Sequence, residues 1–150
     1  MSELELFYFL LPRILGATFC GFIIGSEREL KHKVAGIRTH IIVCVGACIF
    51  ASLSFILIDK YEFEDPTRII AQIVTGVGFL GAGLIFKNDD KVSGVTSAAF
   101  IWLTAAIGVV IGIGYVWTPI IFTIGLLGLL IVLKKVEDKI QDYINKKDKQ

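Results

Sequence analysis

Five long apolar runs, separated by short charged segments, constrain the fold of this chain more than any other feature. A helix needs about 20 mostly apolar residues to cross the hydrocarbon of a bilayer, and each run approaches that length. The hydrophobic share of 55% and the mean hydropathy of +0.74 both exceed what a soluble domain shows. We therefore expect an all-α, polytopic membrane protein, built as a bundle of five transmembrane helices. The predicted spans cover residues 6–25, 37–58, 69–86, 95–113 and 117–133.

The distribution of Lys and Arg predicts how the bundle is oriented. Most of them fall between the first and second spans, between the third and fourth, and in the tail, whereas the other side holds only Lys60 and Arg68. Positive charge stays on the cytoplasmic side, so we predict an outer N-terminus and a cytoplasmic C-terminus. Residues 1–135 then form the transmembrane domain and residues 136–150 a short charged cytoplasmic tail. That tail either continues the fifth helix as an amphipathic piece or is frayed and solvated.

A glycine-rich stretch, TGVGFLGAGLIF, contains the pattern GxGxxG within the third span. A dinucleotide-binding turn needs a preceding strand and an acid about 20 residues further on. Neither is found, because residues 69–86 carry no charge and residues 100–103 contain no acid. We therefore assign the glycines to helix packing, with the third helix at the centre of the bundle; the alternative is a bent helix that lines a substrate path. The predicted packing positions are Gly76, Gly78, Gly81, Gly83, Gly108 and Gly112.

Three polar side chains lie in or next to the spans. Arg13 is near the middle of the first span, where a charge costs at least about 2.5 kcal/mol, so it must face the bundle interior, a partner or water. Snorkelling of its long side chain towards the outer interface is the alternative. Gln72 and Arg68 of the third span are candidate partners for Arg13.

A charged cluster is predicted at the cytoplasmic rim, where the first span ends in GSERE and the second begins in GIRTH. This cluster is either a salt-bridged network that holds helix ends or a cation site in which two carboxylates and waters bind Mg²⁺. The two acids are two residues apart on a helix and point to different sides, which weakens direct chelation. The cluster comprises Glu27, Arg28, Glu29, Arg38 and His40, with Glu27 and Glu29 as the metal candidates. No nucleophile with a nearby base, phosphate loop or catalytic carboxylate pair can be assembled, so we expect no enzymatic activity.

These motifs, taken in order, resemble the MgtC/SapB family of bacterial inner-membrane proteins. The resemblance covers about residues 10–115 and implies a five-helix module of the inner (plasma) membrane with an outer N-terminus. The matching residues are Arg13, Arg68, Gln72, Trp102 and the segments 25–29, 35–40, 76–83, 94–99 and 105–108.

The resemblance also implies a role in growth or survival under magnesium limitation. It suggests a regulator that acts through partners such as the F-type ATP synthase and on membrane potential. Better-studied members carry a soluble ACT-like domain after the membrane module, and we expect these 150 residues to correspond to the membrane module alone.

Three functions remain open. The first is a non-enzymatic membrane regulator that supports magnesium homeostasis by binding other membrane proteins through its glycine-rich faces, with a homodimer as one such association. The second is a transporter or channel for Mg²⁺ or another divalent cation, with a path along Glu27, Glu29 and Gln72. The third is a purely structural module of a larger complex. Mg²⁺ is the only cofactor that the residues suggest.

Overall fold

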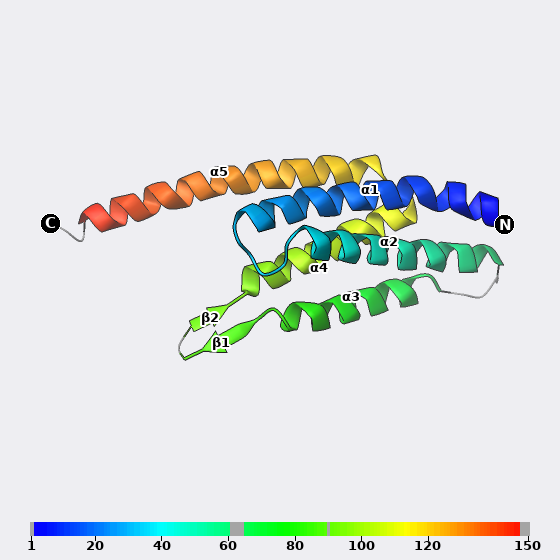
Figure 1. The fold of residues 1–150 in the computed structure, drawn as a ribbon, viewed down its shortest axis with the longest axis horizontal. Coiled ribbons are helices and arrows are strands. Elements are labelled where there is room, and N and C mark those ends of the chain that lie inside the picture. Colours follow the sequence, from blue (N-terminus) through cyan, green and yellow to red (C-terminus); the bar gives the residue numbers. More distant parts are fainter. Residues whose placement is uncertain (1, 61–64, 90, 148–150) are drawn as a thin grey trace.

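The helices lie side by side and run alternately in opposite directions (Figure 1). A computed structural model describes residues 2–60, 65–89 and 91–147. The N-terminus and the start of α3 lie at one end of the bundle; the α1–α2 loop, the hairpin and the C-terminal part of α5 lie at the other, so the three segments rich in Lys and Arg share one end. The elements are α1 (Glu3–Leu30), α2 (Ile37–Lys60), α3 (Thr67–Ala82), β1 (Phe86–Asn88), β2 (Lys91–Ser93), α4 (Val95–Ile113) and α5 (Trp117–Lys147).

Four helices, α1, α2, α4 and α5, are long and apolar enough to cross a membrane. The remaining helix, α3, has 16 residues, which at 1.5 Å per residue is about 24 Å, against roughly 30 Å of hydrocarbon. Our prediction of a span over residues 69–86 was wrong at its end, because α3 stops at Ala82 and Phe86 pairs with Ser93 in an antiparallel hairpin. Glycines weaken the last helical turn, and the polar segment after Phe86 favours a turn, with Asp89 at φ 48°.

The start of α3 is fixed by Asp65. Its Oδ1 accepts hydrogen bonds from the backbone N–H of Thr67 at 2.9 Å and from the hydroxyl of Thr67 at 2.7 Å. These two bonds hold the pKa of the Asp65 carboxyl below its usual value, because they favour the charged form. The carboxylate of Asp65 therefore caps the N-terminal end of α3.

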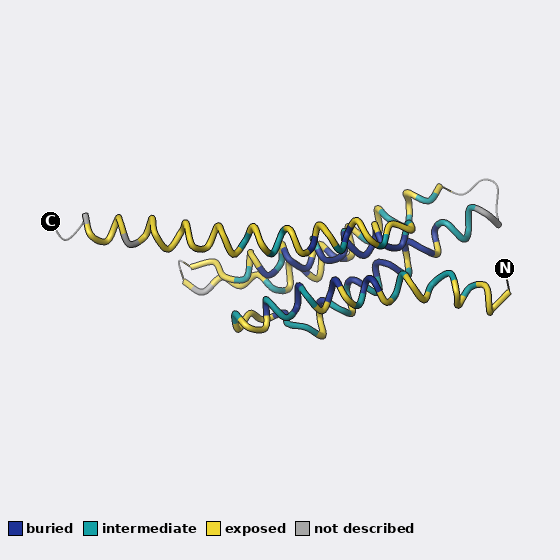
Figure 2. The backbone as a smooth tube through the Cα atoms, turned by 90° about the horizontal axis from the view of Figure 1, so that it is seen from above, coloured by how far each residue is buried: buried dark blue, intermediate teal, exposed yellow. Residues whose placement is uncertain are grey.

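The centre of the bundle is formed by α2 and α4, and the prediction that α3 occupies it was wrong. Ten residues of α4 are buried, whereas in α3 only Val77 and Gly81 are. A Cβ added at Gly76 or Gly78 would meet no atom within 4 Å, so these glycines permit a close approach that no described helix makes. Figure 2 shows the buried stretches near the middle of the bundle and the exposed length of the chain towards its C-terminus.

The contact between α4 and α2 is a close approach of two backbones. A Cβ at Gly108 would overlap the carbonyl oxygen of Cys44, and a Cβ at Gly112 would overlap that of Cys48. The hydroxyl of Ser52 also donates a hydrogen bond of 3.1 Å to the carbonyl oxygen of Gly112. Small residues and such interhelical hydrogen bonds are what hold helices together in lipid.

An overlapping face of α2, nearer its start, approaches α1 equally closely. A Cβ at Gly21 would lie 2.7 Å from the Cα of Ile41, and a Cβ at Gly25 would lie 2.5 Å from the Cα of Ile37. Both glycines of the GxxxG pair in α1 are buried. As a result, α1 and α4 both pack closely on α2 through glycines, and the three helices share one buried cluster.

The other predicted packing glycines have different surroundings. A Cβ at Gly81 would make ordinary contact with Ala98 at 3.6 Å, which places this residue between α3 and α4. Gly83 follows the last residue of α3 as its C-cap. Gly94 joins the hairpin to α4 at φ 88°, and a Cβ there would overlap the carbonyl oxygen of Leu84. Only glycine satisfies both the positive φ and the close approach.

The charged tail continues α5 as one helix of 31 residues that ends at Lys147. Of the two alternatives for the tail, the structure shows the helical one. Val136 and Ile140 of this extension are exposed, so they do not pack against the bundle.

Substituting Gly112 by Leu is expected to destabilise the bundle. The added side chain would force α2 and α4 apart, and overpacking of this kind costs about 1–3 kcal/mol. Thermal unfolding of the purified protein in detergent measures the change. The matched control is Gly128→Leu in α5, where a Cβ meets nothing within 4 Å, and equal melting temperatures for the two variants would contradict the packing described.

Candidate functional site

Arg28, from the predicted rim cluster, is a buried charge that connects α1 to α4. Its side chain lies where α1 ends, and the residue is 3% exposed. The guanidinium carbon is 4.2 Å from the centre of the Phe100 ring, and Nη2 donates a long hydrogen bond of 3.5 Å to the hydroxyl of Ser97. A cation over an aromatic face is stabilised by the ring quadrupole.

Glu27 is engaged by two cations. It forms an ion pair with Lys31, one helical turn further on, and its Oε2 lies 3.6 Å from Nη1 of Arg28. Its charge is therefore divided between a buried guanidinium and a partly exposed ammonium group.

Glu29 has a different role, since it caps α2. Its Oε2 accepts a hydrogen bond of 2.9 Å from the backbone N–H of Ile37, the first residue of α2. The first N–H groups of a helix have no partner within the helix, and a carboxylate there also interacts favourably with the helix dipole. Glu29 thus fixes the loop between α1 and α2.

His40, from α2, lies close enough to Arg28 and Glu27 for their charges to act on it. His40 is fully buried, with Nδ1 2.9 Å from the carbonyl oxygen of Gly36, and its Nε2 is buried without a hydrogen-bond partner. Arg38 is exposed and has no ion pair within the part of the chain that the structure describes.

The donor set at the rim does not fit a protein-built Mg²⁺ site. Glu27 and Glu29 interact with different groups, and among the described residues no three His, Cys, Asp or Glu side chains gather in a way that could hold a metal ion. Mg²⁺ prefers an octahedral set of oxygens with several waters. Metal binding by this pair stays a prediction, without support from their arrangement.

Arg13 is half-buried and turns back along its own helix. Its Nη1 donates to the carbonyl oxygen of Phe9, and the guanidinium carbon lies 3.6 Å from the centre of the Phe9 ring. A Cβ at Gly114 would lie 3.3 Å from Nη2, so Arg13 also adjoins the turn between α4 and α5. Neither Gln72 nor Arg68 forms a hydrogen bond with it among the described residues.

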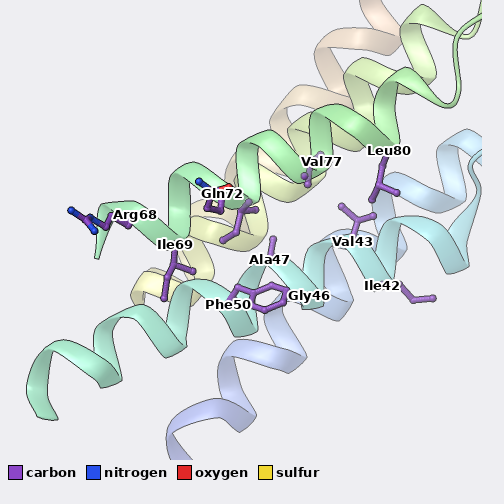
Figure 3. A pocket seen from close by; sticks show the side chains of 12 residues that line it. Ile42, Val43, Gly46, Ala47, Phe50, Arg68, Ile69, Gln72, Val77 and Leu80 are labelled. Carbon is purple, nitrogen blue, oxygen red and sulfur yellow. The ribbon is translucent and has the colours of Figure 1, made fainter. Parts of the chain in front are cut away.

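A groove of about 730 Å³ lies between α2 and α3. Figure 3 shows that its lining side chains come from these two facing helices, with Arg68 near the start of α3 and Leu80 towards its other end. A Cβ at Gly46 of α2 or at Gly76 of α3 would meet nothing within 4 Å. Apart from Arg68 and Gln72, the lining is apolar.

Comparison with known proteins identifies the family. The family model described as "MgtC family" matches residues 14–139, which is most of the chain. This chain belongs to the MgtC family. No solved structure matches it.

Several members of the MgtC family are similar over most of this chain. It is 40% identical over 139 residues to the "Putative magnesium transporter YhiD" of Escherichia coli strain K12, covering 86% of this chain and 59% of the relative. It is 40% identical over 121 residues to "Protein MgtC" of Brucella abortus, covering 81% and 50%. For "Protein MgtC" of Salmonella typhimurium the identity is 36% over 140 residues, covering 93% and 59%. The chain therefore spans between half and three-fifths of the length of these relatives.

Sequence reasoning missed the α4 residues that hold Arg28 in this MgtC family member. Ser97 and Phe100 lie three apart, so they share one face of a helix, and both are buried. A hydroxyl and an aromatic ring at that spacing, near the predicted rim, could have predicted that α4 packs against the charged end of α1.

Replacing Glu29 by Gln is expected to lower stability through the loss of a charged cap. Glutamine keeps an acceptor oxygen but removes the charge that interacts with the helix dipole, which costs about 0.3–1 kcal/mol, and the same loss should appear with and without added Mg²⁺. Thermal unfolding in detergent checks this, with Arg38→Gln as the control because Arg38 is an exposed charge of the same rim. A loss that appears only when Mg²⁺ is present would show that Glu29 acts as a metal ligand.

Proposed function

We propose that this chain is a non-enzymatic membrane regulator that supports magnesium homeostasis by binding a transmembrane helix of another membrane protein. The observation that carries the proposal is the open groove between α2 and α3. The printed name of the Escherichia coli relative connects that protein with magnesium, and shared membership of the MgtC family is our ground for extending the connection to this chain.

The groove has the shape and chemistry that a transmembrane helix requires. In lipid, helix association depends on close packing, and bare glycines let backbones approach. Gly46 and Gly76 line opposite walls of the groove without a contact at their Cβ positions. A helix with small residues on one face fits such walls.

The polar end of the groove adds a requirement on the partner. Arg68 and Gln72 are exposed and lie on successive turns of α3. A guanidinium and an amide group at this level need partners in the membrane. We therefore expect the partner helix to carry a carboxylate or another hydrogen-bond acceptor at the same depth. The family resemblance makes the F-type ATP synthase the first partner to examine.

The alternative function, transport of Mg²⁺ or another divalent cation, is motivated by the printed name of the Escherichia coli relative. A cation route through a membrane is usually lined by acidic groups or rings of carbonyl oxygens. Among the described residues that line the groove, the only charged side chain is that of Arg68. This lining favours protein binding over cation passage.

Filling the groove should abolish function without affecting the fold. In a bacterium that lacks its own family member, the parent chain is expected to restore growth at limiting Mg²⁺, whereas Gly76→Leu should not, because the leucine occupies the space of the partner helix. Gly125→Leu in α5, also without a neighbour at its Cβ, is the matched control, and membrane levels of all three proteins are measured by immunoblot. Equal growth with both variants would contradict the proposal.

Two further measurements separate regulation from transport. A photo-crosslinker at position 80, in the groove, is expected to capture one membrane protein, and the captured protein must then co-purify with the parent chain but not with Gly76→Leu. Liposomes carrying the purified chain and a Mg²⁺-sensitive dye are expected to show no flux above empty liposomes. Flux that Gly76→Leu abolishes would establish the transporter instead.

A further inference from the structure

A second cavity, of about 240 Å³, lies where the α1–α2 loop, the hairpin and the first turn of α4 meet. It is separate from the groove between α2 and α3, with which it shares no lining residue. No carboxylate is found among the described residues that line it. Its polar lining consists of Arg28, His32, Lys33, Ser93, Thr96 and Ser97.

Arg28 gives this cavity an incompletely paired buried charge. The residue is only 3% exposed, and its Nε has no hydrogen-bond partner. The nearest carboxylate, that of Glu27, is 3.6 Å away and is shared with Lys31. A buried donor without a partner carries a full desolvation cost, which an acceptor in the cavity would remove.

The first turn of α4 supplies a second, independent source of positive potential. Gly94 is the N-cap, so no side chain caps this helix, and its first turn contains no acid. The free N–H groups of a helix start and the helix dipole both favour an anion. With 19 residues, α4 is long enough for that dipole to be complete. Gly94 also brings the hairpin backbone against this turn, which places Ser93 beside the helix start.

We propose that this cavity binds a phosphate group. The fork of Arg28 matches a tetrahedral oxyanion, the hydroxyls of Ser97 and Thr96 donate to it, and Lys33 adds charge at the exposed side. The same phosphate chemistry is offered by inorganic phosphate in solution and by the headgroup of an anionic lipid such as phosphatidic acid. Phosphate binding can be measured on the isolated chain, so its test does not depend on the groove or on a partner protein.

The test uses the full chain, purified in an uncharged detergent and titrated with inorganic phosphate at constant ionic strength. Phosphate is expected to raise the melting temperature, with saturation, while chloride at the same ionic strength does not. Thr96→Asp places a carboxylate in the cavity and should weaken phosphate binding at least about tenfold. An acid in the first turn favours the helix itself, so a loss of binding in this variant is not a loss of fold. Thr96→Asn, which keeps a hydrogen-bond donor and adds no charge, should bind phosphate more tightly than Thr96→Asp, and the distant control Arg38→Gln should bind as the parent does.

A parallel arm identifies the source of the phosphate. The chain is placed in nanodiscs of phosphatidylcholine with or without phosphatidic acid, and the lipid that it retains is measured by native mass spectrometry. Retention of phosphatidic acid by the parent but not by Thr96→Asp, with no effect of inorganic phosphate, assigns the site to a lipid headgroup. Saturable stabilisation by inorganic phosphate assigns it to a soluble ligand. Neither effect, or equal effects in the parent and in Thr96→Asp, would overturn the proposal.

Discussion

The structure depends on the close approach of α2 to two neighbours at once. Gly21 and Gly25 of α1 admit the backbone of α2 near its start, and Gly108 and Gly112 of α4 admit it further along. Because lipid is as apolar as the side chains that it surrounds, this close contact replaces the hydrophobic drive that would assemble a soluble bundle. With α1 and α4 both fixed to α2, their ends lie close enough for a side chain of α1 to reach α4.

The two arginines of α1 illustrate one solution to the cost of charge near a membrane. Arg13 and Arg28 each place the guanidinium carbon over a phenylalanine ring and donate a hydrogen bond to an oxygen. Each also keeps a buried Nε without a partner. An aromatic face and a neutral oxygen stabilise a cation less completely than a carboxylate does, and the carboxylate near Arg28, that of Glu27, is shared with Lys31. Both arginine side chains therefore retain positive potential at defined places.

Periodicity and charge predicted much of this architecture. Apolar runs placed the start of each helix within a few residues, but they missed the end of α3 and the extension of α5 into the charged tail. Gly108 and Gly112, two of the predicted packing positions, lie at an interface between helices. The sequence failed where the partner of a residue lies far along the chain. Clustered glycines in α3 predicted a central helix, but glycine shows only where a neighbour can approach and not whether one does. Likewise, the charged segments at the rim suggested Glu27 and Glu29 as a metal pair, although their spacing counted against it, and in the structure Glu29 caps α2 while Glu27 pairs with Lys31.

The sparse burial of α3 also has a consequence for motion. Regions with few buried contacts open at a small fraction of the global free energy of unfolding. In α3 only Val77 and Gly81 are buried, and the helix is connected to α4 through a hairpin of two three-residue strands. Detaching α3 therefore leaves the contacts of α1, α2 and α4 intact. Thermal fluctuation can accordingly change the width of the groove between α2 and α3, while α1, α2 and α4 keep their mutual contacts.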